Sequence, residues 1–324
     1  MFAGPRRVEL ESIDVGDAGP GQVLVRTAYS GISGGTEMLA YRGEVDPAAP
    51  LDETLGAFAG TFAFPHPYGY SCVGVVERSG GDVAEGARVF AFHPHQDVFV
   101  IDERDVVALG SADLRTATLF PLVETALQVT LDAGARLGEA VAVFGQGAVG
   151  ILIAALLQRS GAEVLGVEPD PARRDAASAF GIRAVEPVAL ADHVATATGG
   201  WGVALAIEAS GDPSALRQAL SILAHEGTAL VCSWFGTKDV PLPLGAQFHR
   251  RRLTIRSTQV STIPSSLAPT WDRSRRRAVT RDLLDELPLK LLATHEFDFE
   301  QAPVAFEAVD HGEPGLLHAA LRYP

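Results

Sequence analysis

The chain has 324 residues, 47% hydrophobic and 20% charged, with a formal net charge of −14. This length suffices for two domains with separate cores. The acidic balance argues against nucleic acid or an anionic membrane as a partner. The two cysteines, Cys72 and Cys232, exclude a four-cysteine zinc lobe and provide no disulfide framework.

The N-terminal residues lack the apolar segment of a signal peptide. No apolar run approaches the ~20 residues that a membrane-spanning helix needs. The sequence therefore predicts a cytoplasmic protein that acts on a small molecule and binds neither nucleic acid nor membrane.

The first hundred residues predict a small β-barrel, because short β-branched runs alternate with glycine turns. Between the second and third strands, residues 31–67 predict a long irregular loop, and such loops are often functional. The expected strands are residues 8–13, 22–29, 70–78, 87–92 and 97–101.

Residues 113–134 have helical periodicity, and strands then alternate with helices up to about residue 260, which indicates a parallel sheet. Asp212 or Ser210 could cap a helix. An arginine-rich helix over 271–287 predicts a solvated basic face, and the tail predicts a strand, a helix over 301–310 and a final strand. The expected strands of the parallel sheet are residues 141–144, 163–167, 183–187, 203–208, 227–233 and 253–259.

The segment GQGAVG follows the apolar run 141–144 and precedes an apolar helix at 151–159. Its glycines have the G-x-G-x-x-G spacing of a dinucleotide-binding turn. Gly145 permits the turn, Gly147 lets a pyrophosphate approach the backbone, and Gly150 lets helix and strand pack closely. The helix N-terminus favours the phosphate charge.

Glu168 ends the next strand, 18 residues after Gly150, where a carboxylate can accept hydrogen bonds from ribose hydroxyls. It would repel a 2′-phosphate, so the sequence favours NAD(H) over NADP(H). Arg173 either borders the adenosine ribose or is an ordinary surface arginine. The other residues expected to line the cofactor are Gln146, Ala148, Val149 and Ser210.

The order of these features resembles the medium-chain dehydrogenase/reductase superfamily over nearly the whole chain. The matching features are the β-rich N-terminal part, GQGAVG, IEASG at 207–211 and the closing pattern THEF…AFEAV…LRYP. The resemblance implies an α/β fold in which a GroES-like β-barrel catalytic domain, residues 1–121 and 262–324, flanks a doubly wound Rossmann domain, residues 122–261. It also implies an active site in the cleft between them, and a dimer or tetramer.

Four segments are similar to the bacteriochlorophyllide dehydrogenase-like subgroup, whose best-known member oxidises a hydroxyethyl group on a tetrapyrrole. They are YSGISGGTE at 29–37, YGY at 68–70, HPHQ at 93–96 and VETAL at 123–127. This resemblance implies oxidation of a secondary alcohol on a bulky metabolite, or the reverse reduction of a ketone.

Zinc enzymes of the superfamily use three protein ligands, and this chain departs from all three. Ser33 stands in place of the cysteine, Tyr70 in place of the histidine, and Phe120 with Pro121 where the third ligand is expected. A serine hydroxyl is a poor zinc ligand. We therefore expect no zinc, although His93 and His95 with Glu37 or Glu124 could form a different metal site.

Without zinc, side chains must handle the proton and the charge on the substrate oxygen. The resemblance places Thr36 at the proton-relay hydroxyl. Tyr70 either faces the substrate oxygen or fills the lost metal site. His93 and His95 are candidate bases or structural residues. Glu124 either contacts the nicotinamide or is paired with another side chain.

Two other functions remain open. One is a zinc-free enoyl or quinone reductase, against which GQGAVG and Glu168 both argue. The other is a nucleotide-binding protein without catalysis, suggested by the loss of all three zinc ligands.

Overall fold

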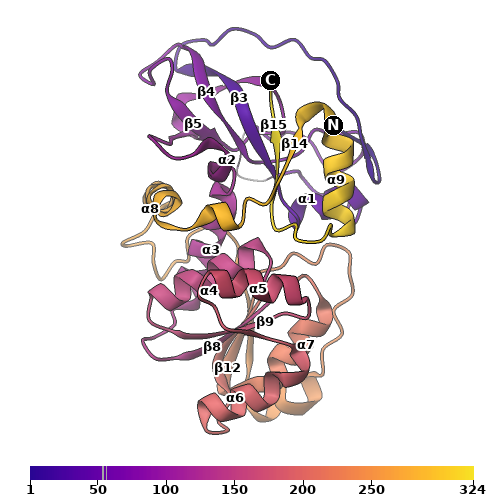
Figure 1. The fold of residues 1–324 in the computed structure, drawn as a ribbon, viewed down its shortest axis with the longest axis vertical. Coiled ribbons are helices and arrows are strands. Elements are labelled where there is room, and N and C mark those ends of the chain that lie inside the picture. Colours follow the sequence, from indigo (N-terminus) through magenta and orange to yellow (C-terminus); the bar gives the residue numbers. More distant parts are fainter. Residues whose placement is uncertain (53–54, 56) are drawn as a thin grey trace. The chain divides into compact units, whose positions relative to one another are not determined.

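The structure is a computed structural model that describes residues 1–52, 55 and 57–324. The chain divides into two compact units (Figure 1). Unit 1 comprises residues 1–121 and 277–324, and unit 2 comprises residues 122–276. No helix in the described part of the chain is both long and apolar enough to cross a membrane.

Unit 2 contains the predicted parallel sheet, with six strands in the order β10-β9-β8-β11-β12-β13. Every neighbouring pair is parallel. The strands are β8 (Ala140–Phe144), β9 (Glu163–Val167), β10 (Ala184–Val185), β11 (Val203–Glu208), β12 (Leu223–Val231) and β13 (Thr254–Ser257).

Helices connect these strands, as parallel pairing requires. Helix α4 packs on β8 and β9, and α7 packs on β11 and β12 (Figure 1). The helices that begin between residues 120 and 275 are α3 (Phe120–Ala133), α4 (Ala148–Arg159), α5 (Pro171–Ala179), α6 (Leu190–Thr198), α7 (Pro213–Ile222) and α8 (Arg273–Glu286).

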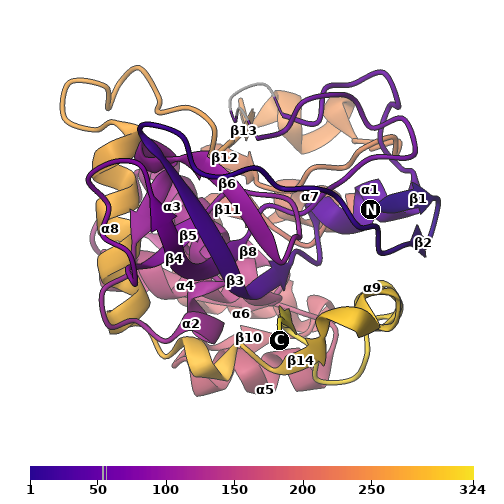
Figure 2. The ribbon, with the colours of Figure 1, turned by 90° about the horizontal axis from the view of Figure 1, so that it is seen from above.

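Unit 1 is built around the long strand β3, which is visible beside β4 in Figure 2. The first half of β3 pairs with β6, its second half pairs with β15, and β4 pairs along its other edge. The strands are β1 (Phe2–Gly4), β2 (Arg7–Val8), β3 (Gln22–Ile32), β4 (Cys72–Ser79), β5 (Arg88–Ala91), β6 (Val98–Asp102), β7 (Val106–Ala108), β14 (His295–Asp298) and β15 (Ala319–Arg322).

Three helices of unit 1 complete it: α1 (Thr36–Arg42), α2 (Leu114–Ala117) and α9 (Ala302–His311). Helix α1 lies within the segment expected to be irregular, so that prediction is wrong for residues 36–42. The helix is buried over Glu37–Tyr41 and ends at Gly43 in the left-handed conformation, φ 73°. Residues 53, 54 and 56 of the same segment lie outside the described residues.

The strand expected at residues 8–13 is also wrong, because regular structure ends at Val8. The apolar residues that suggested it are exposed, Leu10 by 46% and Ile13 by 61%. A period-two pattern predicts a strand only where one face becomes buried, and here neither face does.

The expected solvated face of the arginine-rich helix is wrong at Arg276 and, in part, at Arg277, which is half-buried with its guanidinium over the ring of Phe92. Arg276 of α8 is only 2% exposed, and its guanidinium is paired with two buried side chains of α3. Arg273 and Arg275 are exposed as expected.

Candidate active site

The glycine loop lies between β8 and α4, and two of its glycines are required by close contacts. Gly145 has φ 86°, and a Cβ there would lie 2.7 Å from the Cα of Ser210. A Cβ at Gly150 would lie 1.9 Å from the carbonyl oxygen of Gly145. Both distances are shorter than non-bonded contacts allow, so a larger residue at either position would displace the backbone beside it.

Gly147 has a different surrounding, because a Cβ there would meet nothing within 4 Å. It is the N-cap of α4 and provides no side-chain cap for the first N–H groups, which continue at Ala148 and Val149. An uncapped helix start beneath open space matches what a phosphate group needs. The loop therefore fits a dinucleotide pyrophosphate.

Glu168 ties the glycine loop to the end of β9. Its Oε2 accepts the backbone N–H of Gln146 at 2.7 Å, and its Oε1 accepts that of Asp170 at 3.0 Å. The residue is 3% exposed. Since a carboxylate can accept about four hydrogen bonds, Glu168 keeps acceptor capacity for ribose hydroxyls.

The side chain of Gln146 does not extend away from the loop. It is fully buried and donates from Nε2 to the carbonyl oxygens of Val143 and Gly145. Only its backbone remains suited to the expected cofactor contact.

Arg173 and Ser210, the outer members of the expected cofactor set, differ in how they are held. Arg173 is 42% exposed at its side chain, 4.0 Å from Asp170. Ser210 donates from Oγ to Glu208 and supports the turn at Gly145. The sequence reasoning overlooked Arg174, whose Nη1 binds the carbonyl oxygen of Glu168 at 2.8 Å. Asp212, and not Ser210, caps α7.

Unit 1 gathers a polar cluster from four separate segments. Thr36 and Glu37 form the first turn of α1, Tyr70 precedes β4, and His95 follows β5. Ser33 comes directly after β3. We call these five residues the polar cluster, and the structure thus brings together three of the expected catalytic residues: Thr36, Tyr70 and His95.

Tyr70 is partly buried beside two hydroxyl groups of this cluster. The side chains of Ser33 and Thr36 interact with its phenol and lower its pKa, but by less than other groups raise it. Burial, and next the charge of Glu37, raise the pKa of Tyr70 above its ordinary value. At neutral pH the phenol is therefore protonated and acts as a hydrogen-bond donor.

His95 and Glu37 form a buried pair. The Nε2 of His95 lies 2.9 Å from Oε2 of Glu37, whose side chain is fully buried, while 9% of the imidazole is exposed. The other nitrogen, Nδ1, lies 2.7 Å from the hydroxyl of Ser30. Because both ring nitrogens have partners, His95 has none left to contact a substrate directly.

His93 does not join the cluster. Its ring stacks on Phe99 with centroids 4.0 Å apart, and its Nδ1 is 2.9 Å from the carbonyl oxygen of Pro94. Burial lowers the pKa of His93 to about 4. The ring is thus neutral at physiological pH and too weakly basic for the expected role.

Glu124 is a member of unit 2 and is paired, which was one of its two predicted states. Its Oε1 accepts from Nε of Arg276 at 3.0 Å, and both side chains are 3% exposed. The Nη1 of Arg276 also donates to Oε1 of Gln128 at 2.6 Å. This buried network gives Glu124 a structural explanation.

The polar cluster does not fit zinc. Among the described residues, no three histidine, cysteine or carboxylate side chains are grouped so as to hold a metal ion. The cluster offers two hydroxyls and a protonated phenol, and its imidazole and carboxylate are bound to each other. Zinc prefers thiolate, free imidazole and carboxylate ligands.

Gly69 makes room for His95, and this contact can be tested by substitution. Gly69 has φ 105°, and a Cβ would lie 2.3 Å from Cδ2 of His95. We expect Gly69→Ala to displace the imidazole and to lower the free energy of unfolding, measured in urea, by about 1–3 kcal/mol beyond the backbone strain. Gly60→Ala is the matched control, because Gly60 has φ 107° and nothing within 4 Å of a Cβ. Equal destabilisation by the two variants would contradict the contact.

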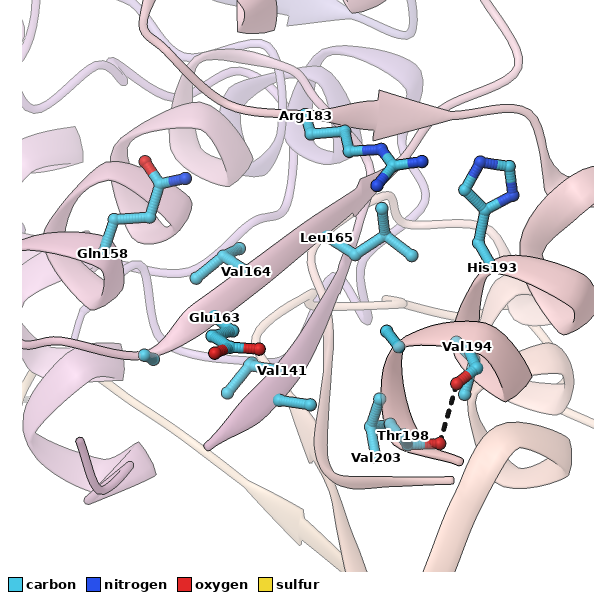
Figure 3. Close-up of a pocket in the computed structure, with 13 residues that line it drawn as sticks. Val141, Gln158, Glu163, Val164, Leu165, Arg183, His193, Val194, Thr198 and Val203 are labelled. Atoms are coloured by element: carbon cyan, nitrogen blue, oxygen red, sulfur yellow. Dashed lines mark hydrogen bonds between the residues drawn. The ribbon is translucent and has the colours of Figure 1, made fainter. Parts of the chain in front are cut away.

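A separate cavity of about 320 Å³ lies in unit 2 at the edge where β8, β9 and β11 begin (Figure 3). Arg183 and His193 extend along one side of it, and Gln158 lies on the other. Nucleotides bind at the carboxyl ends of parallel strands, which is the opposite edge. This cavity is therefore not the expected cofactor site.

Comparison with protein families gives a match within unit 2. Residues 148–275 match the family described as zinc-binding dehydrogenase. The match covers none of the polar cluster, so it carries no information about a metal in this chain.

Curated relatives resemble most of the chain. D-guloside 3-dehydrogenase of Escherichia coli is 26% identical over 81% of each chain. (R,R)-butanediol dehydrogenase of Bacillus subtilis is 28% identical over 79% of this chain and 81% of its own. The 2-desacetyl-2-hydroxyethyl bacteriochlorophyllide A dehydrogenase of Rhodobacter capsulatus is 29% identical over 72% of this chain and 73% of its own.

Solved structures share the fold over almost the full length. The 2R,3R-butanediol dehydrogenase of Bacillus subtilis superposes with a TM-score of 0.78 at 22% identity, covering 98% of this chain and 97% of its own. An Escherichia coli alcohol dehydrogenase in complex with NADH has a TM-score of 0.78 at 17% identity, covering 99% and 97%. The fold over almost the full length, the relatives of similar length and the family match over residues 148–275 make the chain similar to alcohol dehydrogenases of the medium-chain dehydrogenase/reductase superfamily and support an enzyme of that type.

Proposed function

We propose that the protein is a zinc-independent, NAD(H)-dependent oxidoreductase that interconverts a secondary alcohol and a ketone on a bulky metabolite. The observation that supports the proposal is the polar cluster, in which Tyr70 is protonated and interacts with Ser33 and Thr36. The resemblance to the zinc enzymes assigns Ser33 and Tyr70 to positions of metal ligands. The names of the relatives, which refer to a guloside, to butanediol and to a hydroxyethyl bacteriochlorophyllide, agree with an alcohol as substrate.

Tyr70 is the group that we assign to the substrate oxygen. In ketone reduction its phenol donates a hydrogen bond to the carbonyl oxygen and stabilises the negative charge that develops there. In alcohol oxidation the phenol first releases its proton to water, and the phenolate then takes the hydroxyl proton of the alcohol; Ser33 and Thr36 act on the phenol oxygen and favour its ionised form. The bound nicotinamide supplies the hydride chemistry.

The donor set of the polar cluster supports zinc independence, which has a direct test. Purified enzyme would be assayed on panels of secondary alcohols, ketones and enones before and after dialysis against a chelator, with metal content measured on the same samples. We expect turnover of alcohols and ketones that survives chelation. Turnover of enones only would favour a double-bond reductase, and loss of activity that added zinc restores would refute zinc independence.

Glu168 supports the choice of NAD(H), because its buried carboxylate is positioned to repel a 2′-phosphate. We expect Glu168→Gln to weaken NADH binding about 10- to 150-fold, since a hydrogen bond to a charged group contributes about 1.5–3 kcal/mol. Titration of intrinsic fluorescence with NADH and NADPH would measure both dissociation constants. Glu163→Gln, at the exposed start of the same strand, is the matched control. Tighter binding of NADPH than NADH by the unaltered enzyme would contradict the assignment.

A further inference from the structure

Four glutamates are buried in the part of the chain that the structure describes, and two of them have no basic partner. Those of α1 and α3 are paired with His95 and Arg276. The other two are Glu168 and Glu208, which are 3% and 1% exposed and whose carboxylates accept hydrogen bonds only from N–H and hydroxyl groups of nearby turns. A buried charge without a counter-charge is costly, so both carboxylates need an explanation.

Glu208 ends β11 and uses only one of its two carboxylate oxygens. Its Oε1 accepts the backbone N–H groups of Ser210 and Gly211, at 2.7 and 3.0 Å, and the hydroxyl of Ser210 at 2.7 Å. Its Oε2 is buried and has no hydrogen-bond partner among the described residues. In the sheet Glu208 lies in register with Phe144 of β8 and Val231 of β12, which offer no counter-charge. The turn after β11 therefore explains one oxygen and leaves the other without a partner.

The position of Glu208 in the sheet relates it to the nicotinamide half of the cofactor. Strand β8 lies between β9 and β11, and a dinucleotide binds across the carboxyl ends of the strands where their order reverses. Glu168, at the end of β9, is suited to the adenosine ribose, and the start of α4 to the pyrophosphate. The other half of the cofactor then extends past β8 towards the ends of β11 and β12. The turn that Glu208 holds also adjoins the glycine loop, because a Cβ at Gly145 would lie 2.7 Å from the Cα of Ser210.

The two redox forms of the cofactor differ in charge at this half. The nicotinamide ring is positively charged in NAD⁺ and becomes neutral when it accepts a hydride. A buried anion on that side attracts the charged ring and has little effect on the neutral one. We propose that Glu208 is a specificity-determining residue, whose charge favours the binding of NAD⁺ over that of NADH. The inference rests on the proposed function for the identity of the cofactor, and goes beyond it by assigning a preference for one redox form to one side chain.

Calorimetric titrations with NAD⁺ and with NADH test this preference without any substrate. Glu208→Gln removes the charge and keeps an oxygen that can accept the hydrogen bonds of the turn. We expect the ratio of the dissociation constant of NAD⁺ to that of NADH to rise about tenfold, mainly because NAD⁺ binds more weakly. Glu168→Gln is the matched control, since it removes the other carboxylate, on the adenosine side. It should weaken both forms alike and leave the ratio within about twofold of its original value.

A second pair of variants keeps the test independent of how well Glu208→Gln folds. Glu208→Asp and Glu208→Asn shorten the side chain equally, so both disturb the turn, and they differ only in charge. We expect the ratio to be about tenfold higher in Glu208→Asn than in Glu208→Asp. Equal ratios in this pair would overturn the inference, because the effect on binding would then come from the shape of the turn.

The same titrations separate this inference from the proposed function. If the unaltered protein binds neither NAD⁺ nor NADH, both the proposed function and the role of Glu208 are refuted. If it binds both and the ratio does not change in Glu208→Gln, or changes as much in Glu168→Gln, only the role of Glu208 is refuted. If the ratio shifts as expected but no alcohol or ketone is turned over, the proposed reaction fails and the preference set by Glu208 stands.

Discussion

Tyr70→Phe is expected to lower kcat by about 100- to 10,000-fold, the range associated with loss of a positioned acid–base group. The substitution removes one hydroxyl and keeps the ring that packs against the core of unit 1. The effect should fall on kcat more than on KM, because the phenol acts on charge that develops in the transition state. Steady-state kinetics with the best alcohol from the substrate panel would measure both constants.

Tyr68→Phe is the matched control for this experiment. Tyr68 is also a buried tyrosine with a raised pKa, two residues away, but it lies within an aromatic group with Phe58 and Phe62. We expect its removal to leave kcat within about threefold, the size of an indirect packing effect. Equal losses in the two variants would show that Tyr70 fills the lost metal site without acting on the substrate.

Local sequence patterns were sufficient to predict the parallel sheet of unit 2. Strand β11 was predicted residue for residue, because a continuous apolar run bounded by glycine at one end and a cap at the other has few alternatives. The roles of Gly145 and Gly150 are also local, since both depend on contacts at the start of α4. Such features are encoded within about thirty residues of chain.

The polar cluster could be predicted only in part, because long-range contacts decide which residues meet. Glu37 and His95 are separated by 58 positions. Resemblance to the superfamily drew attention to Thr36 and Tyr70, but no pattern in the sequence separates His95 from His93. The acid that follows Thr36 was the only signal for the partner of His95.

In the arginine-rich helix, the local pattern predicts the wrong environment for one residue. Five arginines within nine residues suggest a solvated surface, since charged side chains are rarely buried. One of them, Arg276, is nevertheless buried because α3 presents Glu124 and Gln128 to it. The burial of Arg276 is explained by its pairing with Glu124, which lies 152 positions away in the sequence.

Breaking that pair is expected to cause the largest loss of stability among the substitutions considered. Arg276→Met removes the guanidinium that pairs with the buried carboxylate of Glu124 and with Gln128. Removing one partner of a buried ion pair costs about 3–5 kcal/mol. Urea-induced unfolding followed by circular dichroism would measure this loss, and Arg273→Met, at an exposed position of the same helix, should change the free energy of unfolding by less than about 0.5 kcal/mol.

The double variant Glu124→Leu with Arg276→Met decides between charge and shape as the cause. If Arg276→Met is unstable because it leaves a buried charge without its partner, replacing both residues by apolar ones should recover most of the stability. Neither ion then has to be buried. If α3 and α8 instead need the specific hydrogen bonds of Arg276 to Glu124 and Gln128, the double variant should remain as unstable as Arg276→Met. If the double variant recovers stability and kcat is unchanged, Glu124 has a structural role. If it recovers stability but kcat falls, Glu124 has a catalytic role.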